Sequence, residues 1–254
     1  MTEILLFFAG LLAGAVNSLA GGGSFIAFPA LLFAGVPLVM ANASNTYAAL
    51  PGYVSGAMGY WPAIRPHRDR LLAYTIVAAV FGYLGAELLL VVSEAQFALV
   101  VPWLMLFAVV LFAFGNGFNS IVRRLAGERH GARVLGLMAL WGMLALVCLY
   151  GGFFNAGLGI LLLAFLAIAG MQDIHAMNGL KLWISSVVSV IAVVRFALDG
   201  AIDWYHGSIT LAGVVIGGYA AARLAMLAPT RVIRLGVIVY GALMTAYFFY
   251  AAYA

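Results

Sequence analysis

Residues 17–24 read NSLAGGGS, and residues 155–159 return to the same composition as NAGLG. Both stretches lie inside long apolar runs, although asparagine and glycine are poor helix formers. Three consecutive glycines, Gly21, Gly22 and Gly23, favour a break in the helix over a packed helical surface. The sequence therefore predicts two long apolar segments, each of which is interrupted near its middle.

The composition is that of an integral membrane protein. Of the 254 residues, 66% are hydrophobic and 8% are charged, and the mean hydropathy is +1.13. An ordinary soluble domain carries about 25% charged residues. Cys148 is the only cysteine, which excludes a disulfide framework or a thiolate metal cluster within one chain. We therefore expect one transmembrane domain over 1–254, with no soluble domain, cofactor or metal site.

Most of the basic residues lie in three connections, which we predict to be cytoplasmic. These connections are 62–70, 117–133 and 227–234. Because Lys and Arg gather in the cytoplasmic loops of membrane proteins, the formal charge of +4 reflects topology and gives no indication of a nucleic-acid partner. The connections around 93–96 and 199–203 contain acidic residues and no basic ones, so we expect them on the outer side.

Six apolar segments have the length of a membrane span, about 20 residues. They are 38–61, 71–92, 97–114, 173–196, 205–226 and 232–251. The apolar regions 3–36 and 134–170 remain. For all three basic loops to face the cytoplasm, each of these regions must begin and end on one side of the membrane. Each is therefore predicted to be a re-entrant hairpin with a short second leg, at 24–35 or 158–170.

The two halves of the chain share one order of elements. Repeat one covers about 1–116, the basic connector covers 117–133, and repeat two covers 134–254. Since the first repeat starts outside and the second inside, their topologies are opposite, as in many secondary transporters. The predicted fold class is an all-α membrane protein, a polytopic helical bundle of two inverted repeats. Each repeat has a glycine-broken re-entrant hairpin followed by three transmembrane helices.

The two breaks predict a site for an anion. A short helix begins directly after each break, so its free N–H groups and positive dipole end point into the break. The hydroxyl of Ser24 can donate a hydrogen bond, and side-chain amides can donate without placing a formal charge in the membrane. These amides belong to Asn17, Asn45, Asn155 and Asn178.

At these residues the chain resembles the sulfite exporter TauE/SafE family, also called the toluene sulfonate uptake permease group. The resemblance runs through 10–61, which contains GLLAGAVNSLAGGGSFIAFP, and 149–196, which contains YGGFFNAGLGILLLAF. It implies a transporter of sulfite, thiosulfate, sulfonates and related small anions in the inner membrane of bacteria. It also implies a pathway lined by Asn17, Gly21, Gly22, Gly23, Ser24, Asn45, Asn155, Gly157, Gly159 and Asn178.

Two positions bear on the charge of that pathway. Many relatives carry Lys or Arg just after the position of Asn45, where this chain has Thr46, whereas Lys181 is retained. Lys181 is expected either to face the substrate or to extend its long side chain to the cytoplasmic surface. Glu87 lies well inside a predicted span, where an ionisable group is a functional candidate. We expect it either to carry a coupling proton or to pair with a buried base.

Other glycines are expected to pack helices closely because they are spaced four residues apart. These pairs are Gly10 and Gly14, Gly52 and Gly56, and Gly213 and Gly217. Since such pairs serve packing within and between chains alike, a homodimer is left open.

The predicted function is secondary transport of a small oxyanion across the bacterial inner membrane, by alternating access at the repeat interface. The expected partners are the small anion, the lipid bilayer and a coupling ion, either a proton or sodium. The alternatives are an anion-selective channel and an uptake permease for a small carboxylate. An intramembrane serine hydrolase is disfavoured because all four histidines fall in loops or at the ends of spans. We therefore expect no enzyme activity.

Overall fold

The computed structural model describes residues 1–19, 22–126, 133–224 and 230–253, with side chains for 1–18, 22–114, 138–220 and 235–253. Every element in these ranges is a helix. In chain order they are α1 (Thr2–Leu19), α2 (Ser24–Phe33), α3 (Leu38–Gly59), α4 (Trp61–Ile64), the 3-10 helix η1 (Arg65–His67), α5 (Arg68–Val91), α6 (Glu94–Ala126), α7 (Arg133–Phe153), α8 (Leu158–Ile168), α9 (Ile174–Leu198), α10 (Trp204–Leu224) and α11 (Thr230–Tyr253). The predicted site residue Gly21 and parts of the predicted loops 117–133 and 227–234 lie outside the described residues.

Four helices in the described ranges are long and apolar enough to cross a membrane. They are Trp61–Val91, Glu94–Phe114, Ile174–Leu198 and Leu235–Tyr253, which correspond to four of the six predicted spans. The other two predicted spans, 38–61 and 205–226, form α3 and α10 but do not meet the same criterion of length and hydropathy. In α3 the reason is a polar run from Asn42 to Thr46 that is buried against protein.

Both apolar regions that the sequence predicted to be interrupted are broken. After α1 the chain resumes as α2 at Ser24, and after α7 it resumes as α8 at Leu158. Gly157, which precedes α8, has a φ of +83°, a conformation that favours glycine over residues with a Cβ. The short helices have 10 and 11 residues, which is about 15 to 17 Å of helix at ~1.5 Å per residue. That is roughly half the ~30 Å hydrocarbon core of a bilayer.

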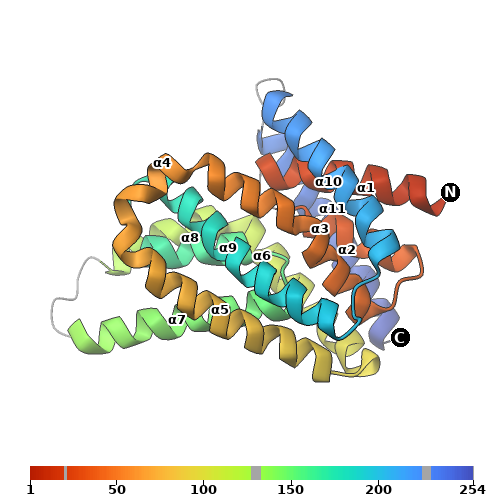
Figure 1. Ribbon diagram of the computed structural model, residues 1–254, viewed down its shortest axis with the longest axis horizontal. Helices are drawn as coiled ribbons and strands as arrows, with labels where there is room; N and C mark the ends of the chain where they lie inside the picture. Colours follow the sequence, from red (N-terminus) through yellow and green to blue (C-terminus); the bar gives the residue numbers. More distant parts are fainter. Residues whose placement is uncertain (20–21, 127–132, 225–229, 254) are drawn as a thin grey trace.

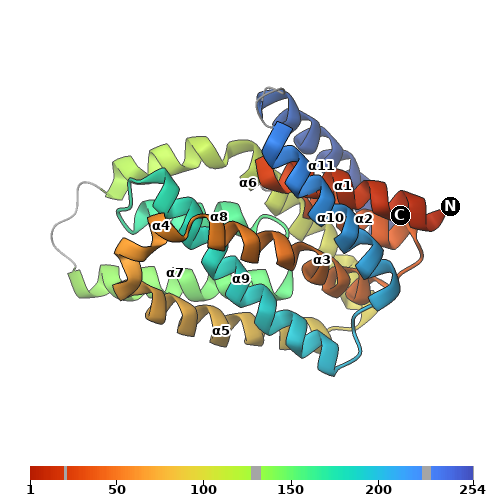
Figure 2. The ribbon, with the colours of Figure 1, turned by 45° about the horizontal axis from the view of Figure 1, so that its top comes forward.

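The helices of the two halves pack in matching pairs. When α1, α2, α3, α5 and α6 are matched in order with α7, α8, α9, α10 and α11, α1 packs along α10 as α7 packs along α5. In the same way α3 contacts α10 as α9 contacts α5, and α2 contacts α11 as α8 contacts α6. In both views α1 lies beside α10 at the right, and α5 lies beside α7 along the lower edge (Figure 1, Figure 2). The predicted repetition of elements is thus accompanied by a repetition of contacts.

Glycines make the closest helix crossings. A Cβ on Gly10 of α1 would collide with the carbonyl oxygen of Thr210 in α10, and a Cβ on Gly213 would collide with that of Phe7. The close packing predicted for these glycines is confirmed. The same prediction is wrong for Gly52, because a Cβ there would meet only the amide nitrogen of Asn17, at 3.9 Å. Gly52 instead lines a cavity.

The crossing of α7 with α5 gives a test of this packing. Gly152→Ala should destabilise the protein, because the added Cβ would collide with the carbonyl oxygen of Gly82. Overpacking of this kind costs about 1–3 kcal/mol, so the midpoint of thermal unfolding in detergent should fall. Gly142→Ala on the same helix is the matched control, since nothing lies within 4 Å of its Cβ and alanine favours the helix. Equal midpoints for the two variants would contradict the tight crossing.

Candidate functional site

A small cavity lies where the two helix breaks meet. Its volume is about 30 Å³, which is room for one or two water-sized groups. The lining comes from both breaks and from α3 and α9. The lining residues are Asn17, Gly22, Ser24, Tyr53, Asn155, Gly157, Leu158, Gly159, Lys181, Leu182 and Ser185. The structure therefore brings together Asn17, Ser24, Asn155 and Lys181 with three of the predicted glycines, Gly22, Gly157 and Gly159.

The N-terminal ends of α2 and α8 both reach this cavity. Ser24 is the first residue of α2, Leu158 is the first residue of α8, and both residues line the cavity. Neither helix has a side-chain hydrogen bond at its N-cap, which is Gly23 in α2 and Gly157 in α8. Uncapped helix N-termini carry partial positive charge and present N–H donors. Two such ends at one small cavity favour a negatively charged group there.

Asn155 lines the cavity but has both ends of its amide bonded to protein. Its Oδ1 accepts a hydrogen bond from the Tyr53 hydroxyl at 2.8 Å, and its Nδ2 donates to Ser189 Oγ at 3.1 Å. These bonds tie the second break to α3 and to α9. The hydrogen bond to substrate predicted for Asn155 stays a prediction, and the second N–H of Nδ2 is the donor that could make it.

Ser185 is a cavity residue that the sequence analysis missed. Its side chain is 1% exposed, and its Oγ has no hydrogen-bond partner among the described residues. A buried polar group without a partner is uncommon and points to a ligand or water at the site. Ser185 follows Lys181 by four residues, so both side chains lie on one face of α9. That spacing is the sequence signal that could have found it.

Lys181 lies between the small cavity and a larger one, and it lines both. Its Nζ donates a hydrogen bond to Asn178 Oδ1 at 3.2 Å. Its stem packs against the second break, because a Cβ on Gly159 would lie 3.3 Å from Lys181 Cδ. Lys181 is the only lysine of the chain. Of the two positions that the sequence analysis left open for it, the structure shows a lysine whose side chain reaches the cavities.

The larger cavity has a volume of about 910 Å³ and extends between α1, α3, α9 and α10. The two cavities adjoin each other and share three lining residues, Asn17, Lys181 and Leu182. Its polar lining residues are Asn17, Ser18, Ser55, Tyr60, Asn178, Lys181 and Tyr219. In the described part of the chain neither cavity is lined by Asp or Glu. The combined lining is thus rich in hydrogen-bond donors and carries one cation.

Asn45 and Thr46 lie apart from both cavities. Each is 2% exposed, and neither is among the described residues that line these two cavities. The Thr46 hydroxyl donates to the carbonyl oxygen of Asn42 within α3, at 3.0 Å. Asn42 in turn donates from Nδ2 to the carbonyl oxygen of Phe153, at 2.8 Å. This polar part of α3 packs against the end of α7, and the substrate contacts predicted for Asn45 and Thr46 stay predictions.

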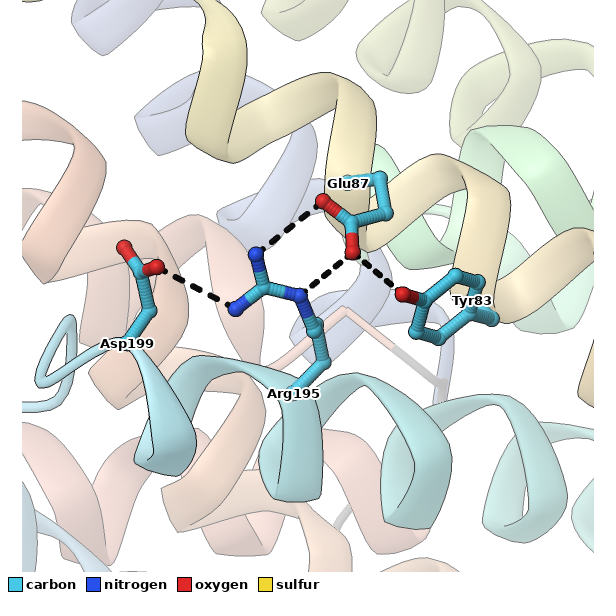
Figure 3. Close-up of polar contacts among 4 residues, drawn as sticks. All are labelled: Tyr83, Glu87, Arg195 and Asp199. Atoms are coloured by element: carbon cyan, nitrogen blue, oxygen red, sulfur yellow. Dashed lines mark hydrogen bonds and ion pairs between the residues drawn. The ribbon is translucent and has the colours of Figure 1, made fainter.

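Glu87 pairs with Arg195 (Figure 3). Arg195 Nε donates to Glu87 Oε1 at 2.6 Å, and Nη2 donates to Oε2 at 3.1 Å. The Tyr83 hydroxyl donates to the same carboxylate, and Arg195 Nη1 donates to Asp199 Oδ1 at 3.2 Å. Of the two roles expected for Glu87, the structure shows the partner of a base. Transfer of a coupling proton stays a prediction, and Glu87 lines neither described cavity.

Removal of one hydroxyl at a time tests which of the two hydroxyls, that of Tyr53 or that of Ser185, has a structural partner. Tyr53→Phe should lower the midpoint of thermal unfolding, because it leaves the buried Asn155 Oδ1 without its donor, at a cost of about 1–3 kcal/mol. Ser185→Ala removes a hydroxyl that bonds nothing in the described structure, so the midpoint should stay the same or rise. Equal destabilisation by both variants would show that Ser185 has a structural partner, contrary to this geometry.

The known proteins to which this chain is similar are described as membrane transporters. The family model of the sulfite exporter TauE/SafE matches residues 6–248. The chain is 29% identical over 246 residues to a probable membrane transporter protein of Haemophilus influenzae, covering 95% of this chain and 92% of that protein. It is 28% identical over 231 residues to the probable membrane transporter protein ORF9 of a Sinorhizobium species, with 90% and 85% covered. It is 27% identical over 252 residues to the probable membrane transporter protein YfcA of Escherichia coli K12, with 97% and 89% covered. No solved structure gives a significant match.

Proposed function

The chain belongs to the sulfite exporter TauE/SafE family of membrane transporters, and on that premise we propose that it is a secondary transporter for a small oxyanion. The observation that carries this proposal is the small cavity where the N-terminal ends of α2 and α8 meet beside Lys181. The two helix ends and the ammonium group each favour negative charge. A group with several acceptor oxygens fits donors that converge from α1, α2, α8 and α9.

The two cavities together suit a small oxyanion, either alone or attached to an organic tail. The small cavity takes oxygen-sized groups only, whereas the adjoining cavity of about 910 Å³ leaves ample room. Sulfite or thiosulfate would place an oxygen in the small cavity, beside Lys181, Ser24 and Ser185, and the rest of the anion in the adjoining cavity. An organosulfonate would place its sulfonate at the same position and its tail beside Gly52 and Leu182. Sulfite, thiosulfate and organosulfonates are therefore the proposed substrate class.

The proposed arrangement in the membrane follows from the matched halves. The two repeats have opposite topology, and α2 and α8 reach about half-way through the bilayer before the chain returns. This is the architecture in which irregular backbone is tolerated at membrane depth, because it borders protein or a wet cavity. The loop 62–70 would face the cytoplasm of a bacterial cell and the loop 199–203 would face outward. The larger cavity is lined by Tyr60, next to the basic loop, so the structure would be an inward-facing state.

This topology can be tested by cysteine labelling in membrane vesicles. Arg68→Cys and Ala201→Cys, each in a Cys148→Ala background, should react with an impermeant thiol reagent from opposite faces. Arg68 is exposed at the start of α5, and Ala201 lies between α9 and α10. Reaction of both cysteines from the same face would contradict the proposed orientation.

The transported anion can be tested by substrate-induced currents in proteoliposomes. We expect currents with one or more of sulfite, thiosulfate and an organosulfonate, and none with lactate. Lys181→Gln keeps a polar side chain but removes the charge, and should raise the half-saturating anion concentration by at least about tenfold, the loss of one charge-assisted contact.

Arg65→Gln is the matched control, because it removes a basic charge from an exposed residue outside both described cavities. Its currents should equal those of the wild type. If Lys181→Gln also behaved as wild type, the small cavity would not be the binding site. If lactate gave the only current, the chain would be a carboxylate permease.

A further inference from the structure

Two pairs of helices occupy matching positions in the two halves, α3 with α10 and α9 with α5. The first pair is hydrogen-bonded near one end and borders the larger cavity at the other. Near its N-terminal end the main-chain N–H of Asp203 donates to Ser44 Oγ at 2.9 Å. Toward the C-terminal ends of both helices the larger cavity lies between them, with Gly56 and Tyr60 of α3 and Gly218 of α10 in its lining.

The second pair is in contact at several levels between Thr75 and Glu87 of α5. Near the N-terminal half of α5, Trp183 Nε1 donates to Thr75 Oγ1 at 2.9 Å. Further along, a Cβ on Gly82 would lie 3.1 Å from the Cα of Val188, so the two backbones approach closely. Val188 is fully buried. The end of this pair that matches the open end of α3 and α10 is therefore shut.

The Glu87–Arg195 pair joins α5 to α9 at that shut end. Figure 3 shows the carboxylate of α5 facing the guanidinium of α9. The other two bonds of the cluster stay within one helix or at its end, because Tyr83 lies on α5 with Glu87, and Asp199 follows α9. The paired side chains of Glu87 and Arg195 are 32% and 20% exposed, so both are partly removed from the surroundings of the protein. Their two-pronged geometry is the strongest form of such a contact.

We propose that the Glu87–Arg195 pair is the latch of a gate between α5 and α9, and that it opens once in each transport cycle. In the second state, α5 and α9 separate at their C-terminal ends, and α3 and α10 close on the larger cavity. The two helix pairs thereby exchange their arrangements. The inference rests on the alternating access proposed above, but it does not depend on which anion is carried.

The test measures the reactivity of two single cysteines in reconstituted nanodiscs, where a water-soluble methanethiosulfonate reagent reaches both faces. Both are placed in a Cys148→Ala background, in which the buried native thiol is absent. Ser55→Cys reports on the larger cavity, which it lines, and Val188→Cys reports on the shut face between α9 and α5. Each reporter is combined with Glu87→Gln, which removes the charge of the latch.

We expect Glu87→Gln to raise the labelling rate of Val188→Cys by roughly tenfold and to lower that of Ser55→Cys, because one gate opens as the other closes. Asp199→Asn is the matched control. It removes a negative charge from the same cluster without breaking the bridge between helices, so both rates should stay unchanged.

Three results would overturn the proposal. Unchanged rates in Glu87→Gln would show that the pair does not hold the gate. A rise in both rates would show that the pair holds the fold together instead. The same shift in Asp199→Asn would assign the effect to lost charge. The labelling experiment needs no transported anion. A failure of the latch proposal can therefore be told apart from a failure of the proposed oxyanion transport, which the currents test.

Discussion

The structure depends on the satisfaction of backbone groups at two helix ends that begin inside an apolar protein. A helix that starts in such surroundings leaves N–H groups without partners, and these are tolerated only beside protein donors and acceptors or beside a wet cavity. At the ends of α2 and α8 the condition is met partly by backbone carbonyls, since the N–H of Phe25 donates to Gly22 O and that of Leu158 to Asn155 O, both at 3.2 Å. Both ends also line one common cavity. The glycine crossings of α1 with α10 and of α7 with α5 allow the long helices to approach closely enough for the two breaks to converge.

The convergence of the two helix ends also determines the electrostatic surroundings of Lys181. An ammonium group beside two positive helix ends is electrostatically unfavourable, and the hydrogen bond from its Nζ to Asn178 Oδ1 offsets only part of that cost. The unpartnered hydroxyl of Ser185 adds a second unfavourable group in the same small volume. An anion at the cavity would satisfy all of them together. The proposed binding energy would thus come from several contacts made together rather than from any single strong contact.

The sequence predicts well where the apolar segments are interrupted. It predicts poorly which face of each helix lines the cavities. Glycine and asparagine in apolar runs indicate where a helix must stop, and the predicted starts of α2 and α8 agree with the structure. Which side of α3 faces the pathway depends instead on contacts far along the chain, such as the bond from Asn42 to Phe153, 111 residues away. Asn45 and Thr46 lie apart from the cavities for this reason. Arg195 likewise lies 108 residues from Glu87, a separation at which periodicity gives no signal.

Diverged repeats give such a protein a preferred state. If the two halves were identical, the α3–α10 and α5–α9 gates would have equal energies, and neither conformation would be favoured. The halves differ, since Asn17 and Asn45 are 28 residues apart, whereas Asn155 and Asn178 are 23 apart. The ion pair of Glu87 with Arg195 belongs to the α5–α9 gate, and the matching ends of α3 and α10 border the larger cavity with Gly56 and Gly218. In the proposed cycle this ion pair stabilises the state in which α5 and α9 are in contact at their C-terminal ends, and so biases the equilibrium toward the structure described. The proposed transport would require that this bias be small enough for the bound anion to reverse it, which is consistent with a cluster in which only the bonds between Glu87 and Arg195 join the two helices.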